Sequence, residues 1–582
     1  MSARRSADVP IVRVLIDRGS VTPDSLAFAV YPRGATSPTS MITWRAWCEA
    51  SRAAAAALLA LGVQPGDRVA VLAGNRPLWP IADMAIQMIR AVGVGIYPTS
   101  APSQVEELLI DSGATVIITH SSTHLTELLA IRTRLPQSLT IICDQVNLTI
   151  SDDVHDWTAW CADGANRLAR DAAIVAALEA RLQSLSLDDL AALIYTSGST
   201  GEPKGACISH RYLTASAASI SDMLGLTAAD QSLSFLPFSH AAERVFGECT
   251  RIWVGMAAAL IEDPSDLFTV AADFHPTLFA ALPRIFERLY EAAEVARRNG
   301  DDARAAITSR IGARCRVATS GGAALPVHIA QDLASLGLPI LGAYGQTEHL
   351  CVAMNRPTDP HLDTVGAPMP GTELRVAENG EVLVRRSALS FAGYFGKPDE
   401  TRAAFTDDGL WLRTGDLGAI DSNGLLRITG RVKELIALSN GRKIAPLPIE
   451  AALTATPYIA HAVCYGEGRK YLTVLLSLRH DVVRAWAREH GAQGAWSTLV
   501  HHAQLRAELQ RAVDGVNATL ARTDRIHSFA ITDREFDHEG GELTPTLKVI
   551  RSVIAMRFAD TFNALYSSQS GKQGAHAGPS DG

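Results

Sequence analysis

The chain has 582 residues, which is too long for one compact core and predicts several folding units. Hydrophobic residues make up 47% of the sequence and charged residues 20%, a balance that excludes a disordered or collagen-like chain. The formal net charge of −8 provides no basic field, so nucleic acid is not an expected partner.

The cysteines and the apolar runs indicate a cytoplasmic protein. None of the eight cysteines forms a CxxC pair, so the sequence suggests neither a zinc site nor a disulfide framework. Arg13, Asp17 and Arg18 interrupt the first apolar stretch, which therefore lacks the uncharged core of a signal peptide. The longest apolar run, at 252–261, is about half of the ~20 residues that a membrane helix needs. The expected protein is soluble, and the sequence leaves a peripheral membrane contact and a homodimer open.

Helix and strand patterns alternate through the first part of the chain. An Ala- and Leu-rich stretch at 44–61 predicts a helix that ends at Gly62, and the apolar run at 68–73 predicts a strand. The same alternation continues with expected helices at 79–91 and 104–111, expected strands at 93–97 and 114–119, and a recurrence between 250 and 345. This order is typical of a parallel α/β sheet.

The pattern changes after about residue 360. Short strands divided by Gly, Asn and Asp turns are expected at 373–376, 380–384 and 425–428, and they predict a smaller β-rich unit.

Beyond Gly430 the patterns predict a separate α+β domain. Strands are expected at 459–464 and 471–478, and helices at 481–521. The last stretch, 567–582, has no apolar periodicity and predicts a disordered tail.

A Gly-rich loop with the sequence Tyr-Thr-Ser-Gly-Ser-Thr-Gly-Glu-Pro-Lys-Gly occupies 195–205, directly after the apolar run 191–194. Glycine lets backbone amides approach an anion closely, and hydroxyl and ammonium groups add further donors. The loop is not a Walker A motif, because Gly205 is followed by Ala206 and Cys207. It predicts a phosphate site, and the expected contacts are Thr196, Ser197, Gly198, Ser199, Thr200, Gly201 and Lys204.

Further strings follow this loop in order. They are Leu-Pro-Phe-Ser-His-Ala-Ala-Glu-Arg at 236–244, Ser-Gly-Gly-Ala at 320–323, Gly-Ala-Tyr-Gly-Gln-Thr-Glu at 342–348, Trp-Leu-Arg-Thr-Gly-Asp at 411–416, Gly-Arg-Val-Lys-Glu-Leu-Ile at 430–436 and Gly-Glu-Leu-Thr-Pro-Thr-Leu-Lys at 541–548. From about 43 to 555 the chain therefore resembles the adenylate-forming superfamily of acyl-CoA synthetases, peptide-synthetase adenylation domains and luciferases. Within it, the long-chain fatty acid:CoA ligase subgroup is the most similar.

The resemblance implies an α/β fold with a large N-terminal domain of two α/β subdomains and a β-rich barrel-like unit, at 1–430. A smaller mobile α+β C-terminal domain at 431–566 would carry the catalytic lysine, ahead of the tail at 567–582. The implied reaction converts a fatty acid through an acyl-adenylate to its CoA thioester and releases AMP and pyrophosphate. Its cofactors would be ATP, Mg²⁺ and coenzyme A.

The reaction requires fixed positive charge, because two anions ~4 Å apart repel by roughly 4 kcal/mol at an effective dielectric constant of 20. By resemblance, Lys548 reaches the carboxylate and the α-phosphate, and Thr347 contacts the α-phosphate. Glu348 and Thr200 are the expected Mg²⁺ ligands, in agreement with the preference of this ion for oxygen.

The resemblance also assigns the nucleoside. Tyr344 would lie beside adenine, Asp416 would accept hydrogen bonds from both ribose hydroxyls, and Arg431 would contact the ribose. Gly322 and Gly345 complete the expected nucleotide site.

The second half-reaction needs a different arrangement, because Lys548 would obstruct the attack of a thiol on the same carbonyl. The resemblance places a hinge at Lys433 and lets Gly441 approach the pantetheine arm of coenzyme A.

The expected acyl pocket lies beside four residues, which are His240, Arg244, Gly321 and Ala323. Some bacterial relatives place a tryptophan gate near position 244, and the presence of Arg244 here argues against that gating scheme.

Three other functions share parts of this sequence pattern. A fatty acyl-AMP ligase would deliver the adenylate to a carrier protein, but such relatives carry an insertion near the domain junction, and the spacing from Asp416 to Gly441 shows none. A luciferase-like oxidation would use the same adenylation residues. An inactive acyl- or nucleotide-binding homologue would have lost key residues, which are present here.

Overall fold

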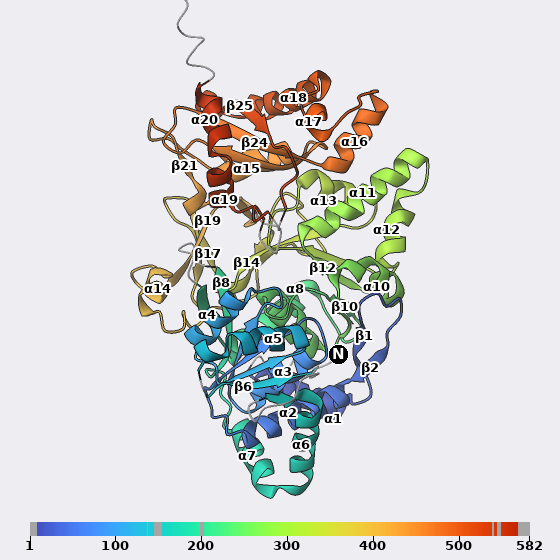
Figure 1. Ribbon diagram of the computed structural model, residues 1–582, viewed down its shortest axis with the longest axis vertical. Coiled ribbons are helices and arrows are strands. Elements are labelled where there is room, and N and C mark those ends of the chain that lie inside the picture. Colours follow the sequence, from blue (N-terminus) through green and yellow to red (C-terminus); the bar gives the residue numbers. More distant parts are fainter. Residues whose placement is uncertain are drawn as a thin grey trace, which may run out of the picture.

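Figure 1 shows a computed structural model of the chain, which describes residues 8–136, 138–144, 154–197, 203–537, 540–543 and 549–567. The chain forms a large lower body, coloured blue to yellow, and a smaller upper body in orange and red (Figure 1). The fold is α/β with several sheets, as expected. The predicted tail lies outside the described residues from 568 onward.

The lower part of the large body contains a sheet in the order β7-β6-β5-β3-β4-β8-β9. Its strands are β3 (Arg68–Leu72), β4 (Val92–Ile96), β5 (Val116–Thr119), β6 (Thr140–Cys143), β7 (Val154–Asp156), β8 (Leu190–Ser197) and β9 (Pro203–Ser209). All neighbouring strands are parallel except β9, which runs antiparallel to β8. The predicted parallel α/β sheet is therefore confirmed.

Helices cover both faces of this sheet, which explains why its strands are apolar throughout rather than alternating. Ala70 and Leu72 pack under α4 (Pro102–Ser112) and α5 (Ser122–Ala130). Val69 and Val71 belong to the opposite core, with α2 (Trp44–Ala60), α3 (Leu78–Met88) and α8 (His210–Leu224). The remaining helical elements of this part are α1 (Ile11–Val21), η1 (Arg132–Arg134), α6 (Trp157–Arg170) and α7 (Ala172–Gln183).

The predicted helix at 44–61 is confirmed, with both ends explained locally. The Thr43 side chain accepts a hydrogen bond from the Ala46 amide at 3.2 Å and so caps the start of α2. After the helix, Gly62 has φ +91°, a conformation that favours glycine.

A second group of strands forms two sheets, in the orders β10-β11-β1-β2 and β12-β13-β14-β15-β16. The strands are β1 (Leu26–Tyr31), β2 (Ser40–Thr43), β10 (Gln231–Ser234), β11 (Ala257–Ile261), β12 (Leu278–Ala281), β13 (Val317–Ser320), β14 (Ile340–Gln346), β15 (His349–Met354) and β16 (Ala367–Pro368). The two sheets adjoin, because the Thr277 amide donates to the Gln231 carbonyl at 2.8 Å.

The helical elements of this second part are η2, a π-helix (Ala242–Cys249), α9 (Thr250–Val254), η3 (Pro264–Asp266), α10 (Leu267–Phe274), α11 (Pro283–Asn299), α12 (Ala303–Ile311) and α13 (Val327–Ser335). The recurrence of the α/β pattern that was predicted between 250 and 345 is confirmed.

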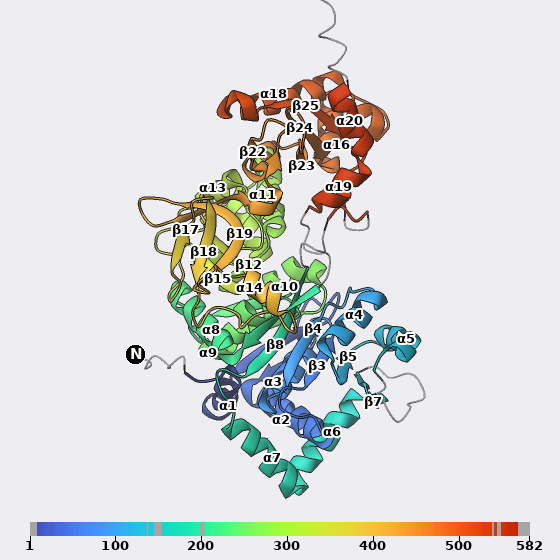
Figure 2. The same cartoon turned by 90° about the vertical axis from the view of Figure 1, so that its left-hand side faces the viewer.

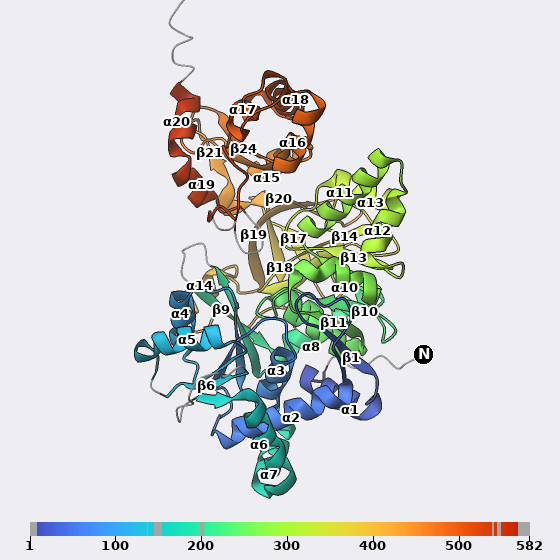
Figure 3. The same ribbon diagram turned by 45° about the vertical axis from the view of Figure 1, so that its right-hand side comes forward.

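The predicted β-rich unit is an antiparallel sheet in the order β17-β18-β19-β20, with the short helix α14 (Pro398–Ala403) beside it. Its strands are β17 (Leu374–Val376), β18 (Glu381–Arg385), β19 (Trp411–Ile420) and β20 (Leu426–Arg431). In Figure 3, β20 points from the large body toward the upper body.

The upper body has cores of its own, separate from those below it. Its strands are β21 (Ile436–Ala437) and β22 (Lys443–Ile444), which pair with each other, and β23 (Ile459–Tyr465), β24 (Leu472–Leu478) and β25 (Ile526–Ile531), which form a second sheet. The helices are η4 (Val432–Glu434), α15 (Pro446–Thr454), α16 (His480–Glu489), α17 (Trp496–Leu499), α18 (Ala503–Thr519), η5 (Arg522–Asp524), α19 (Arg551–Arg557) and α20 (Ala559–Ser567). Figure 2 shows α18 and α20 at the outer end of this body. Across the described ranges, no helix is long and apolar enough to span a membrane.

Candidate active site

Three predicted nucleoside residues meet at one point in the structure. Tyr344 on β14 donates its hydroxyl hydrogen to Asp416 Oδ2 at 2.6 Å, and Arg431 Nε lies 3.0 Å from Asp416 Oδ1. Asp416 is only 4% exposed. Burial and the neighbouring Asp416 charge raise the pKa of the Tyr344 hydroxyl, so this hydroxyl stays a donor. The carboxylate is thus held by a partner on each of its two oxygens.

The sheet pairing explains part of this arrangement. Asp416 on β19 lies directly opposite Arg431 on β20 in the antiparallel register, so their side chains share one face. Tyr344 comes from a different sheet, 72 residues earlier in the chain.

Thr347 and Glu348 form the two-residue tip of a hairpin between β14 and β15, where Gln346 pairs with His349. At Gly345 a Cβ atom would lie 1.5 Å from the Leu350 carbonyl oxygen, so only glycine fits there.

Tyr212, a fully buried residue of α8, clamps the same hairpin. Its hydroxyl donates to the Thr347 carbonyl at 2.9 Å and accepts from the Leu350 amide at 3.0 Å. The sequence reasoning missed Tyr212, which lies outside the strings that carry the resemblance.

Tyr394 connects this hairpin tip to the phosphate loop. Its hydroxyl donates to Glu348 Oε1, and Lys204 Nζ lies 5.6 Å from the centre of its ring, within cation–π range. The backbone beside Tyr394 is held on β9, because the Phe395 amide donates to the Gly205 carbonyl at 2.8 Å. Burial and the Glu348 charge raise the pKa of Tyr394, which therefore remains a donor. No sequence signal marked this residue, since its contacts are long-range.

The stem of the phosphate loop is a β-hairpin of β8 and β9, in which Thr196 pairs with Lys204. The Thr196 hydroxyl also donates to the Lys204 carbonyl at 3.5 Å. The strand at 191–194 is buried as predicted, and Ser197 ends β8. The predicted contacts Gly198, Ser199, Thr200 and Gly201 lie outside the described residues, as does Lys548.

The expected acyl segment follows β13. Ser320 at its end pairs with Gly342 on the parallel strand β14, so Gly321 lies beside the strand that carries Tyr344. Gly322 has φ +80°, which turns the chain there, and Ala323 follows it. The structure therefore brings Gly321 next to the strand from which Tyr344 reaches Asp416.

His240 lies two residues before the start of the π-helix η2, and its Nδ1 accepts a hydrogen bond from the Ala242 amide at 3.0 Å. Such helices are frequent at functional sites.

Arg244, within η2, is 1% exposed. Its guanidinium is paired with Asp83, donates to the Gly93 carbonyl at 3.3 Å and lies 5.3 Å from the ring centre of Trp79. Arg244 therefore fastens η2 to α3 and β4 from inside the protein. A contact of Arg244 with an acyl chain stays a prediction.

The junction of the two bodies is a single turn. β20 ends at Arg431, and Lys433 is an exposed residue of η4. Arg551 on α19 connects this turn to α15 within the upper body, because its Nε lies 3.4 Å from Glu434 of η4 and its Nη1 donates to Glu450 of α15 at 2.8 Å. The sequence alone did not predict a role for Arg551.

Gly441, the predicted pantetheine contact, lies in the turn between β21 and β22. It has φ +81°, and a Cβ atom there would meet no atom within 4 Å, so the turn is open on that side.

Sequence comparison adds the family. A profile described as AMP-binding enzyme matches residues 17–395, and one described as AMP-binding enzyme C-terminal domain matches residues 433–570.

The curated relatives are similar in sequence along most of their length. The long-chain-fatty-acid–CoA ligase FadD15 of Mycobacterium bovis is 33% identical and covers 89% of this chain and 91% of its own. The long-chain-fatty-acid–CoA ligase heimdall of Drosophila melanogaster is 27% identical, with 90% of each chain covered.

Solved structures share the fold. The anthranilate CoA ligase AuaEII in complex with anthranoyl-AMP superposes with a TM-score of 0.75 at 20% identity, over 96% of this chain and 99% of that chain. ATP-bound MatB from Rhodopseudomonas palustris gives a TM-score of 0.74 at 21% identity, over 96% and 100%. With the profile matches and the FadD15 identity, these findings show that the chain belongs to the AMP-binding enzyme family.

Proposed function

We propose that this protein is an AMP-forming long-chain fatty acid:CoA ligase, which converts a fatty acid through an acyl-adenylate to its CoA thioester. The observation that carries the proposal is the convergence of Tyr344, Asp416 and Arg431 on one face, with Glu348 at the end of the same hairpin as Tyr344. The two relatives described above are 33% and 27% identical to this chain, and both are named long-chain-fatty-acid–CoA ligases. Their names support a long-chain fatty acid as the substrate and CoA as the acceptor.

In this function the cluster binds the nucleoside of ATP. The Asp416 carboxylate accepts hydrogen bonds from both ribose hydroxyls, and Arg431 contacts the ribose from the domain junction. Tyr344 lies beside adenine and holds the carboxylate in place through its 2.6 Å hydrogen bond. Gly322 and Gly345 let the backbone approach the nucleotide.

In the adenylation step a carboxylate oxygen of the fatty acid attacks the α-phosphorus. A new P–O bond forms, the bond to the bridging oxygen of pyrophosphate breaks, and pyrophosphate leaves with the electron pair. Lys548 and Thr347 stabilise the charge at the α-phosphate. The loop residues from Thr196 to Lys204 hold the departing phosphates.

The residues present fit a magnesium ion. Glu348 supplies a carboxylate oxygen and Thr200 a hydroxyl, both hard donors of the kind that Mg²⁺ prefers. Within the described ranges no group of three or more His, Cys, Asp or Glu residues could hold a metal, so the phosphates and water would complete the coordination. When bound, the ion would neutralise phosphate charge during adenylation.

In the second step the thiol of CoA attacks the acyl carbonyl, the bond to AMP breaks, and AMP leaves. We propose that the domain after Gly430 rotates about Lys433 between the steps and presents Gly441 to the pantetheine arm. The single turn of η4 between β20 and β21, and the separate cores of the upper body, support a movable unit. His240, Arg244, Gly321 and Ala323 would border the acyl chain.

A coupled assay tests the proposal. AMP release is measured with acids of two to twenty-four carbons, with and without CoA, and acyl-CoA is identified by mass spectrometry. We expect CoA-dependent turnover that is fastest with long-chain acids. Pyrophosphate exchange without any acyl-CoA product would instead indicate a ligase that serves a carrier protein, and no exchange with any acid would indicate an inactive homologue. The cytoplasmic location, a peripheral membrane contact and a homodimer stay predictions from the sequence.

A further inference from the structure

The segment 391–397, between β18 and α14, runs along the outer side of β9. Because β9 is an edge strand of its sheet, its outer side presents main-chain groups that need partners. The Cys207 amide donates to the Gly393 carbonyl at 2.8 Å, and the Phe395 amide donates to the Gly205 carbonyl at 2.8 Å. The segment is therefore fixed to the stem of the phosphate loop by main-chain hydrogen bonds.

The same segment also holds the hairpin tip that carries Glu348. The Phe391 amide donates to the Glu348 carbonyl at 2.9 Å, and the Tyr394 hydroxyl donates to Glu348 Oε1. Both the main chain and the side chain of Glu348 are thus bound by a segment that is anchored on β9. A carboxylate offers about four acceptor positions, and this hydrogen bond uses one of them, so it orients the group without preventing it from binding a cation.

Local packing leaves the Tyr394 side chain little freedom to turn. Its amide donates to Thr401 Oγ1 of α14 at 2.8 Å, and its ring packs edge-to-face against Phe391, with the ring centres 4.9 Å apart. Phe391 is itself buried. Tyr394 can therefore impose a direction on the groups that it contacts.

The second charged group at Tyr394 is Lys204. Its Nζ lies 5.6 Å from the centre of the Tyr394 ring, and Lys397 at the end of the segment donates to the carbonyl of Pro203, the residue before Lys204, at 3.0 Å. Tyr394 thus contacts a carboxylate through its hydroxyl and an ammonium through its ring. Phenylalanine would fill the same space, so packing accounts for the ring but not for the hydroxyl.

We propose that Tyr394 is a positioning residue for the phosphate end of the ATP site, which orients the Glu348 carboxylate for its cation and keeps the Lys204 ammonium over its ring. The inference rests on the proposed function, in which Glu348 is a Mg²⁺ ligand and Lys204 holds the departing phosphates. The hydrogen-bond partner of a ligating carboxylate fixes its direction, and loss of such a partner typically lowers metal affinity or activity by about 10- to 100-fold. Tyr394 acts through these two side chains and not on the reacting atoms.

The test measures binding apart from turnover in the purified full-length protein. Mn²⁺ replaces Mg²⁺, because it also prefers oxygen ligands and is detected by electron paramagnetic resonance, and a non-hydrolysable analogue replaces ATP. For Tyr394→Phe, which removes the hydroxyl and keeps the ring, we expect the Kd of Mn²⁺ for the protein–analogue complex to rise by about 10- to 100-fold. The Kd of AMP should change by less than about twofold, because the nucleoside cluster around Asp416 is untouched. In pyrophosphate exchange, the Mg²⁺ concentration at half-maximal rate should rise in parallel, and saturating Mg²⁺ should restore kcat.

Tyr394→Leu tests the ring. This variant loses the cation–π contact as well as the hydroxyl, so the ATP analogue without metal should bind about 2- to 5-fold more weakly than it binds to Tyr394→Phe. AMP lacks the two phosphates that leave, so its Kd should be the same for both variants. Equal losses of analogue and AMP affinity would overturn the part of the proposal that concerns Lys204.

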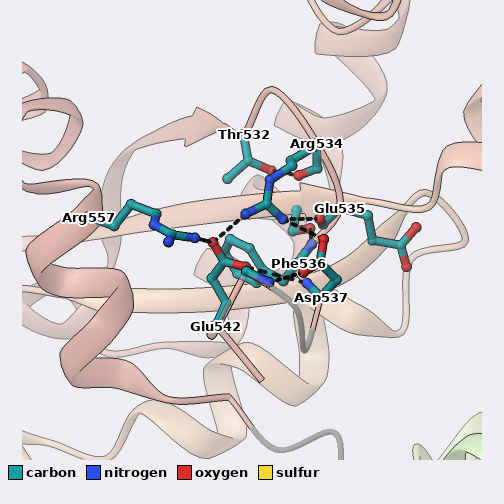
Figure 4. Close-up of polar contacts among 9 residues, drawn as sticks. Thr532, Arg534, Glu535, Phe536, Asp537, Glu542 and Arg557 are labelled. Atoms are coloured by element: carbon teal, nitrogen blue, oxygen red, sulfur yellow. Dashed lines mark hydrogen bonds and ion pairs between the residues drawn. The ribbon is translucent and has the colours of Figure 1, made fainter. Parts of the chain in front are cut away.

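Two controls alter polar contacts elsewhere in the chain. Tyr31→Phe makes the same chemical change in a buried residue of β1, whose hydroxyl donates to Asp273 of α10 at 2.7 Å, and it should leave the Kd values of Mn²⁺ and AMP unchanged. In the upper body, the buried Glu542 carboxylate lies between two arginine side chains (Figure 4), and Arg557→Gln removes one of these partners. This second control should lower the melting temperature and leave both Kd values unchanged.

A double-mutant cycle with Glu348→Ala tests whether the hydroxyl acts through the carboxylate. Tyr394→Phe should weaken Mn²⁺ binding in the wild-type background and cause no further loss in the Glu348→Ala background. An unchanged Kd of Mn²⁺ in Tyr394→Phe, additive losses in the cycle or an equal loss of AMP affinity would overturn the proposal while leaving the proposed function intact. If Glu348→Ala itself binds Mn²⁺ normally, the role of Glu348 in the proposed function fails, and the inference fails with it.

Discussion

Replacement of Asp416 by asparagine tests the nucleoside site directly. The variant keeps the volume of the side chain but exchanges one carboxylate oxygen for an amide NH₂ and removes the charge. The 4% exposure of Asp416 means that water cannot readily replace the lost acceptor. The hydrogen bonds to the ribose hydroxyls would therefore carry most of the effect.

The magnitude follows from the contacts. Arg431 is 57% exposed, so its ion pair with Asp416 is screened and contributes less than about 1 kcal/mol. A hydrogen bond to a buried charged group contributes about 1.5–3 kcal/mol, and asparagine retains only one of the two acceptor oxygens. At 1.4 kcal/mol per tenfold change in affinity, we expect the KM for ATP to rise by about 10- to 100-fold.

The assay is ATP–pyrophosphate exchange at varied ATP and saturating fatty acid. Asp363→Asn is the matched control, because Asp363 pairs with Arg427 on the same strand β20 but both side chains are 49% exposed. The control should leave the KM for ATP unchanged. A normal KM for ATP in a folded Asp416→Asn protein would refute the assignment of Asp416 to the ribose.

Three further substitutions test other parts of the protein. Lys548→Ala should lower pyrophosphate exchange by about 10²-fold or more, the scale of losing one preorganised charge donor, and near-normal exchange would contradict its role. Lys433→Pro should spare exchange and cripple thioester formation from acyl-AMP, whereas equal loss of both steps would argue against a hinge. Arg244→Ala should lower the free energy of unfolding by about 3–5 kcal/mol in urea, because Asp83 is left buried and unpaired, and the exposed Arg167→Ala should not. An Arg244→Ala protein of unchanged stability would show that the buried pair does not hold η2 in place.

Much of the fold follows from local patterns. The helix at 44–61 could be predicted because both of its signals are local in the sequence: the Ala-rich composition of the segment and the glycine that directly follows it. The strands at 68–73 and 191–194 could be predicted because burial on both faces demands continuous apolar residues. Exact ends differ by a few residues, as in α3, which ends at Met88 rather than 91, because helix ends depend on packing.

The candidate site was partly predictable for a different reason. The strings around Tyr344, Asp416 and Arg431 have short local patterns that resemble a known family, so each residue could be named one by one. Their mutual distances could not be predicted, because the Tyr344 contact spans 72 residues and two sheets.

Other partners had no local signal at all. Tyr394 and Tyr212 hold Glu348 and Thr347 through contacts that span 46 and 135 residues, and the burial of Arg244 depends on Asp83, 161 residues away. By itself the sequence determined the order of the elements and which residues are candidates for the site, since periodicity, turns and short strings are local properties. Only the tertiary structure decided which side chains meet, because long-range packing selects the partners of each buried polar group.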